Sequence, residues 1–224
     1  MHYLTNLWNS LDFGSMKDLL LRLCSVFLCL TVHETCHGLA AYALGDPTAK
    51  RQHRLSLNPL RHIDWFGLAM MVVAGFGWAK PVPVNPNYFK NPKRGMAITA
   101  LAGPVSNFLL SLMLLLSLSL VWGHRRSYIT EFEMFLLETA ILSIGLGVFN
   151  LIPIPPLDGY HVLNDLILKG RLYASRKLAG AGQAILYLAL FSGVLTDLLG
   201  YVYDAVLSGV GSAASALLHA FGLF

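Results

Sequence analysis

Long apolar runs separated by short polar segments dominate the sequence. A helix that crosses a bilayer needs about 20 mostly apolar residues, and the chain has such runs at about 18–44, 96–122, 132–152 and 178–203. The second run contains no Lys, Arg, Asp or Glu in 27 positions. We therefore predict an all-α, polytopic membrane protein folded as a helical bundle, with these four runs as its transmembrane spans.

Two further apolar segments do not have the form of a simple crossing. In the segment 65–85, an uncharged stretch of fifteen residues is too short to cross and then breaks at Lys80-Pro81-Val82-Pro83. Irregular backbone at membrane depth is tolerated where protein buries it, so this segment predicts a short re-entrant loop or β-hairpin. The tail 205–224 is rich in Gly, Ala and Ser, and its pattern fits either a fifth span or a helix lying at the membrane interface.

The third run ends in an unusual way. Three prolines fall in the four positions 153–156, where they remove backbone donors and clash with helical geometry. The chain must therefore unwind into a Pro-rich strip inside the bundle. Such a strip could bring Asp158 to a metal held by a neighbouring helix, or Asp158 could instead cap the N-terminus of a helix beginning at Tyr160. The spacing alone leaves both roles open.

Composition and charge support the membrane prediction. Hydrophobic residues make up 55% of the chain and charged residues 12%, whereas a soluble domain carries about 25% charged residues. The net charge of +4 comes from basic residues that flank the apolar runs, and 12 of the 16 Lys and Arg lie at 50–94 or 169–177. Cytoplasmic loops of membrane proteins carry such an excess. We therefore predict that these loops are cytosolic, and we do not expect nucleic acid as a partner.

The chemistry concentrates in the first run, at His33-Glu34-Thr35-Cys36-His37. Residues four apart on a helix face the same direction, so the two histidines can hold one metal ion while Glu34 acts as a base for a metal-bound water. Packing between helices, with Glu34 bonded to one imidazole, is the alternative role for the pair. Three ionisable groups within five residues of a lipid-embedded helix carry a large free-energy cost and are usually functional. The sequence therefore predicts a metal site within the membrane.

Three motifs, in this order along the chain, resemble those of the site-2 protease family of intramembrane zinc metalloproteases. They are HETCH at 33–37, GPVSN at 103–107 and NLIPIPPLDG at 150–159. GFGWAKPVPVNP at 75–86 is similar to the membrane-associated loop of the family's smaller members. The resemblance covers residues 19 to about 168, and it implies a compact form without the PDZ or CBS domains of other members.

The resemblance also implies roles for particular residues. It implies that Zn²⁺ is the cofactor and that three residues bind it: His33, His37 and Asp158. It implies that Glu34 activates the water, that Asn150 holds the substrate backbone and that Asn107 supports the site.

The expected activity is hydrolysis of peptide bonds within or near transmembrane segments of membrane proteins, by one domain spanning 1–224. The expected partners are a transmembrane protein substrate and the lipid bilayer, and the sequence does not decide the oligomeric state. We expect a multi-pass protein of a prokaryotic cell membrane, with its active site nearer the cytosolic face. A non-proteolytic zinc-binding regulator or carrier on the same bundle is the alternative. The intact Glu34 argues against it, because such a protein needs no base.

Overall fold

The structure is a computed structural model that describes residues 16–74, 77–124, 130–168, 176–192 and 194–220. Within these residues the fold is built from helices and contains no named strand, which confirms the predicted all-α class. Short helical turns connect the longer helices: α3 (Thr48–Arg51), η1 (Pro59–Arg61) and η2 (Pro86–Tyr88).

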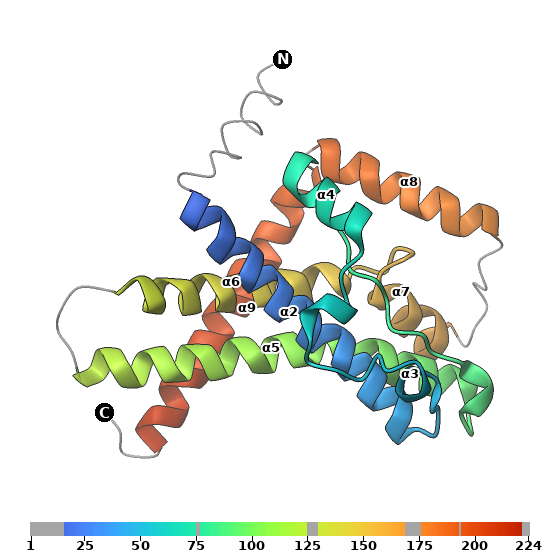
Figure 1. The fold of residues 1–224 in the computed structure, drawn as a ribbon, viewed down its shortest axis with the longest axis horizontal. Coiled ribbons are helices and arrows are strands. Elements are labelled where there is room, and N and C mark those ends of the chain that lie inside the picture. Colours follow the sequence, from blue (N-terminus) through green and yellow to red (C-terminus); the bar gives the residue numbers. More distant parts are fainter. Residues whose placement is uncertain (1–15, 75–76, 125–129, 169–175, 193, 221–224) are drawn as a thin grey trace.

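Three long helices form the centre of the bundle: α2 (Met16–Ala43), α5 (Pro92–His124) and α6 (Glu131–Asn150). In Figure 1, α5 and α6 run side by side and α2 crosses both of them at an angle. Each contains a segment long and apolar enough to cross a membrane, at Lys17–Ala43, Pro92–Val121 and Glu131–Asn150. These segments overlie the predicted spans 18–44, 96–122 and 132–152.

The structure corrects the fourth predicted span, 178–203. That stretch is divided between α8 (Arg176–Ser192) and α9 (Val194–Ala220), which run in different directions in Figure 1. The fourth helical segment that is long and apolar enough to cross is Gly200–Ala220, and α9 packs against α5 and α6. Asp204 is exposed and does not end the helix, since α9 continues through it.

The segment 65–85 is a short loop that returns to its starting point. Its helix α4 (Trp65–Ala74) has 10 residues, so it is about 15 Å long, half of the roughly 30 Å hydrocarbon core of a bilayer. Ile63 and Ala79 then form an isolated antiparallel bridge. This bridge is the only β-pairing among the described residues, so the β-hairpin stays unconfirmed and the re-entrant loop stays a prediction.

The Pro-rich strip joins α6 to α7 (Asp158–Val162), which continues into the π-helical turn η3 (Leu163–Ile167). The strip has no regular helix from residue 151 to 157, as its prolines predict. Leu151, Pro153 and Pro156 of the strip are exposed, whereas Leu157 is buried against Leu186 of α8. This packing holds the beginning of α7 near the middle of the bundle.

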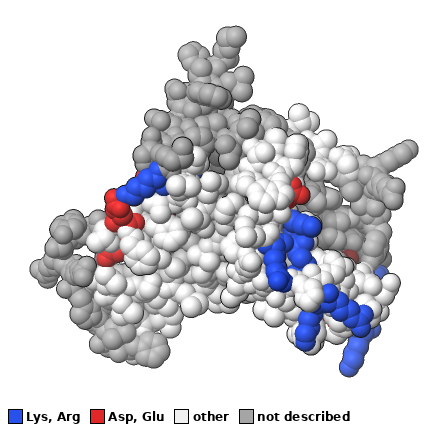
Figure 2. All heavy atoms as spheres, in the orientation of Figure 1, with Lys and Arg blue, Asp and Glu red and all other residues white. Residues whose placement is uncertain are grey.

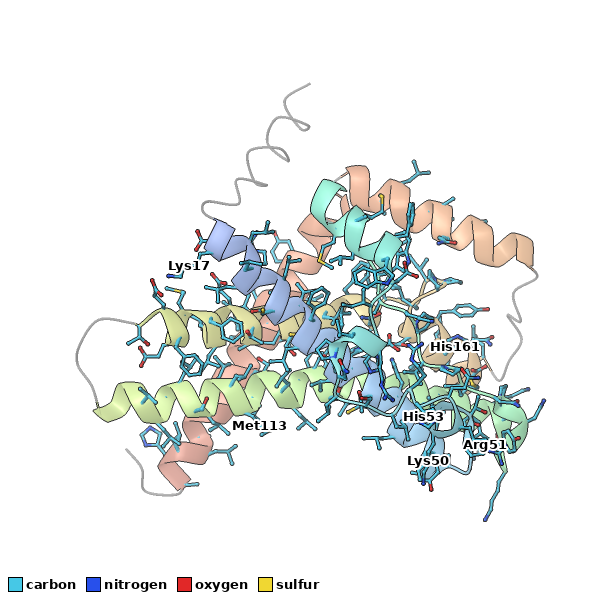
Figure 3. The ribbon with its side chains drawn as sticks, in the orientation of Figure 1. Lys17, Lys50, Arg51, His53, Met113 and His161 are labelled. Carbon is cyan, nitrogen blue, oxygen red and sulfur yellow. The ribbon has the colours of Figure 1, made fainter. Side chains whose placement is uncertain are left out.

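The charged residues are distributed unevenly along the molecule. Lys and Arg gather at one end, over α3 and the loops beside it (Figure 2). Lys17 lies near the other end (Figure 3) and forms an ion pair with Glu131. Lys50, Arg51 and His53 lie together at the basic end (Figure 3). The loop residues 169–175, which we also predicted to be cytosolic, lie outside the described part of the chain.

Candidate metal centre

His33 and His37 lie one turn apart on α2 and are both buried. Their rings are perpendicular, with centroids 4.5 Å apart, and the two Nε2 atoms are 2.9 Å apart. The helical spacing of four residues therefore brings the two nitrogens to one point, as the sequence predicted.

Asp158 is brought to the same point by the Pro-rich strip. Its Oδ2 lies 3.1 Å from Nε2 of His33 and 3.3 Å from Nε2 of His37. The alternative role that we considered, an N-cap, is wrong, because Leu157 is the N-cap of α7 and no side chain caps that helix. The carboxylate of Asp158 therefore faces the two histidines of α2.

Gly159 allows this placement of Asp158. A Cβ atom at position 159 would lie 2.1 Å from the carbonyl oxygen of Leu151 and 2.6 Å from that of Ile152. Only a residue without a side chain lets α7 begin so close to the backbone of the strip. Backbone packing therefore requires glycine at position 159.

The three ligand atoms fit a zinc ion. Zinc in proteins is tetrahedral with bonds of about 2.0–2.2 Å, so two of its ligand atoms are separated by about 3.3–3.6 Å. The distances of 2.9, 3.1 and 3.3 Å between the two imidazole nitrogens and the carboxylate oxygen are close to that value. Oδ2 of Asp158 is also buried without a hydrogen-bond partner in the described structure. Three protein ligands leave the fourth tetrahedral position open, as catalytic zinc requires.

Residues of helix α5 form hydrogen bonds with the Nδ1 atoms of both imidazoles. Nδ1 of His37 donates to the carbonyl of Thr99 at 2.7 Å, and the side-chain amide of Asn107 donates to Nδ1 of His33 at 3.0 Å. The bond donated by His37 orients its ring and leaves Nε2 for the metal, whereas Nδ1 of His33 has to donate to the amide oxygen of Asn107 for its Nε2 to be free. The hydroxyl of Ser143 donates to the backbone carbonyl of Asn107 at 2.8 Å, which connects α6 to the same arrangement.

Gly103 lets α5 approach the histidines this closely. A Cβ atom at position 103 would lie 2.5 Å from Nε2 of His37 and 2.6 Å from Cε1 of His33. The two rings therefore occupy the space that any other residue at 103 would fill.

Glu34 is half-buried and faces the extended segment 80–85. Its Oε2 accepts a hydrogen bond of 2.8 Å from the backbone N–H of Val82. Val82 also packs against α2 one turn after Glu34, where a Cβ atom at Gly38 would lie 3.1 Å from its side chain. Sequence reasoning missed this contact because a backbone donor leaves no mark in the residue types.

The electrostatics keep the carboxyl group of Asp158 ionised. Burial raises the pKa of Asp158, but the two neighbouring imidazoles outweigh this effect and lower the pKa to about 2. The group is therefore in its metal-binding form over the physiological pH range.

Two other polar residues near the strip stand apart from the cluster. Asn150, the last residue of α6, donates its amide to the carbonyl of Leu146 at 2.9 Å, a bond within its own helix. Nδ1 of His161 lies 3.6 Å from Asp165, and its side chain is at the same end of the molecule as Lys50 and Arg51 (Figure 3). The metal cluster itself contains His33, His37 and Asp158.

Comparison with known proteins gives several relatives. The sequence model of peptidase family M50 matches residues 124–192, which include Asp158 but neither histidine. YwhC of Bacillus subtilis, named as a zinc metalloprotease, is 39% identical over 192 residues, covering 82% of this chain and 87% of YwhC. Rip2 of Mycobacterium tuberculosis, also named as a zinc metalloprotease, is 31% identical over 210 residues, covering 88% of this chain and 77% of Rip2. No solved structure gives a significant match to the chain.

Proposed function

The chain belongs to peptidase family M50, the site-2 proteases, and on that premise we propose that it cuts peptide bonds within or near transmembrane segments of membrane proteins. It is a zinc metalloprotease with apolar helices long enough to cross a membrane. The observation that carries the proposal is the buried cluster of His33, His37 and Asp158, drawn from a membrane-length helix and an unwound strip.

The proposed catalytic roles follow from the placement of each side chain. His33, His37 and Asp158 hold Zn²⁺, which when bound supplies a Lewis acid that makes a water molecule in its open position acidic. Glu34, next to His33 in the chain, takes the proton from the attacking water and passes it to the leaving amine. Its Oε2 is held by Val82, which leaves Oε1 for the proton transfer.

A transmembrane substrate must be unwound before it is cut, because a helix hides its peptide bonds in internal hydrogen bonds. We propose that the extended segment 80–85 receives the unwound chain by backbone pairing. The backbone of Val84 makes no hydrogen bond within the described residues, so it is available for such pairing. Asn150, at the end of α6, is proposed to hold the substrate backbone from the other side.

The position of the cluster supports a site nearer the cytosolic face. His37 lies six residues before the end of α2 at Ala43, which is about 9 Å along the helix axis. The chain then enters α3 and the basic end of the molecule (Figure 2). Because basic residues favour the cytoplasmic side, we place that end in the cytosol of a prokaryotic cell, and we treat 1–224 as one catalytic domain.

The decisive experiment combines zinc analysis with cleavage of a transmembrane peptide whose helix is weakened by Gly or Pro. We expect the wild type to hold one zinc and to cut the peptide. Glu34→Gln should keep the zinc and lose cleavage, whereas His33→Ala and Asp158→Ala should lose both. His161→Ala, a histidine outside the cluster, is the matched control and should behave as the wild type does.

Each outcome separates the proposal from its rival. A wild type that binds zinc but cuts no membrane-embedded peptide would favour the non-proteolytic regulator or carrier. Cleavage of soluble unfolded chains in preference to transmembrane peptides would overturn the substrate class alone. Normal cleavage by Glu34→Gln would overturn the role of Glu34 as the base.

A further inference from the structure

Arg54 is a buried arginine that does not belong to the metal cluster. It is 8% exposed, and its Nη2 donates to the carbonyl oxygens of Lys80 at 2.6 Å and Pro81 at 3.3 Å. Among the described residues no carboxylate lies within ion-pair distance of it. Burying a guanidinium without a counter-ion is unfavourable. The position of Arg54 against two backbone carbonyls therefore suggests a specific role.

The residue before Arg54 has an unusual backbone conformation. His53 has a φ of +53°, a left-handed conformation that is uncommon for a residue with a side chain. The N–H of Arg54 then donates to the carbonyl of Ala49 at 2.8 Å, and Arg61 donates to the carbonyl of His53. The turn after α3 is therefore fixed by several bonds.

One peptide group connects Arg54 to the base. The carbonyl of Pro81 accepts from Arg54, and the N–H of Val82, at the other end of the same peptide, donates to Oε2 of Glu34. Because a peptide group is planar and rigid, fixing its carbonyl also fixes the direction of its N–H. A cation on the carbonyl further polarises the group and strengthens the bond that its N–H makes.

We propose that Arg54 is a positioning residue for Glu34, acting through the peptide group between Pro81 and Val82. The guanidinium holds this peptide in place, and the peptide holds one carboxylate oxygen of Glu34 so that the other serves the reaction. This inference rests on the proposed function, since a fixed orientation of Glu34 matters to turnover only if Glu34 is the base. Within the described residues the side chain of Arg54 bonds to the carbonyls of Lys80 and Pro81 and to no metal ligand.

The first test needs no activity. The chain has three Pro–Val pairs, at 81–82, 83–84 and 104–105, so labelling Pro with ¹³C at the carbonyl and Val with ¹⁵N isolates three amide signals. We expect the Val82 amide proton, assigned by Val82→Ala, to resonate at higher frequency than that of Val84. It should move to lower frequency in Arg54→Met and in Glu34→Ala, and stay unchanged in Arg51→Met. An unchanged Val82 signal in Arg54→Met would overturn the proposal.

The second test separates a positioning role from a general structural one. We expect Arg54→Met to keep its zinc and its KM while kcat falls by about tenfold or more, since small displacements of a catalytic group have effects of that size. Arg54→Lys should recover part of kcat, because an ammonium can still donate to one carbonyl. Arg51→Met removes an exposed arginine whose side chain, among the described residues, bonds only to Tyr88 at 3.4 Å, and it should leave both constants unchanged.

Other results of these kinetic measurements would contradict the role proposed for Arg54. A raised KM with an unchanged kcat would mean that Arg54 shapes only the substrate-binding edge, and an unchanged kcat would mean that it does not act on Glu34. If Arg54→Met does not fold, Arg54→Lys decides the question by the same two readouts, with a several-fold lower kcat expected. A wild type without cleavage would refute the proposed function, while the Val82 amide would still decide whether Arg54 controls the bond to Glu34.

Discussion

The side-chain amide of Asn107 lies against the ring of His33, with its Nδ2 3.0 Å from Nδ1 of the imidazole. Asn107 is fully buried, and its Oδ1 has no hydrogen-bond partner in the described structure. A metal on Nε2 leaves the ring proton on Nδ1, and that proton needs an acceptor. A half-turn of the amide presents Oδ1 to it in the same space. Asn107 can therefore form a hydrogen bond with either tautomer of the His33 ring, donating through Nδ2 or accepting through Oδ1.

Removing this amide should weaken zinc binding. In Asn107→Leu the side chain keeps its size, but Nδ1 of His33 loses its partner, so we expect about a 10- to 100-fold loss of zinc affinity. Competition with a chelator of known affinity measures the change. Ser106→Ala is the control, because within the described part of the chain that hydroxyl bonds only to the carbonyl of Gly103 in its own helix. Wild-type affinity in Asn107→Leu would show that the contact does not orient the ring.

Gly103→Ala should disturb the same site by volume. The added Cβ would lie 2.5 Å from Nε2 of His37, so α5 or both rings must move, and forced repacking of this kind costs about 1–3 kcal/mol. We expect lower zinc affinity together with lower thermal stability in detergent. Gly209→Ala, in α9 with no atom within 4 Å of the new Cβ, should leave zinc affinity unchanged. A Gly103→Ala protein that binds zinc normally would show that the helices separate without cost.

The sequence predicted those parts of the site that local geometry determines. His33 and His37 converge because any helix brings residues four apart to one face, and the prolines at 153–156 end α6 at Asn150 for equally local reasons. Asp158 is different. Its approach to α2 depends on the path of the strip and on the close packing at Gly159, so spacing left its role open and the family resemblance supplied it.

Other features could not be predicted from residue types. The bond from Val82 to Glu34 and the bond from His37 to Thr99 use backbone groups, which every residue except proline carries alike. The boundary between α8 and α9 is different, because Ser192-Gly193 and Asp197 interrupt the apolar stretch there. A Ser-Gly pair is a turn signal, which a prediction from hydropathy alone does not use.

Zinc should stabilise the fold by joining α2 to α7. A ligand that binds only the folded state adds about 4 kcal/mol when its concentration is 1,000 times its Kd. We expect a chelator to lower the melting temperature in detergent and added zinc to restore it. Asp158→Ala should show no zinc-dependent shift, whereas His161→Ala should show the full shift. A zinc-dependent shift that persists in Asp158→Ala would place the stabilising metal elsewhere.

Asp46 anchors the far end of the segment 80–85 and should affect substrate binding more than the chemical step. It is fully buried. Its Oδ2 accepts from the N–H of Asn85 at 2.6 Å, and its Oδ1 accepts from the N–H of Thr48 at 2.9 Å. In Asp46→Ala these half-buried donors lose their acceptor, at a cost of at most about 3 kcal/mol each. The loosened end lies beside Val84, which we propose pairs with the substrate, whereas Arg54 and Val82 still hold Glu34.

We therefore expect Asp46→Ala to raise KM while kcat stays close to the wild-type value, the reverse of the pattern expected for Arg54→Met. Hydrogen exchange at the Asn85 amide should become faster at the same time, because its N–H loses a buried acceptor. Thr48→Val removes the hydroxyl that bonds to Oδ1 of Asp46 but leaves the bond to Asn85, so it should keep the wild-type KM. Equal losses in kcat for Asp46→Ala and Arg54→Met would mean that the segment moves as one rigid unit. The two ends would then have no separate roles in binding and in proton transfer.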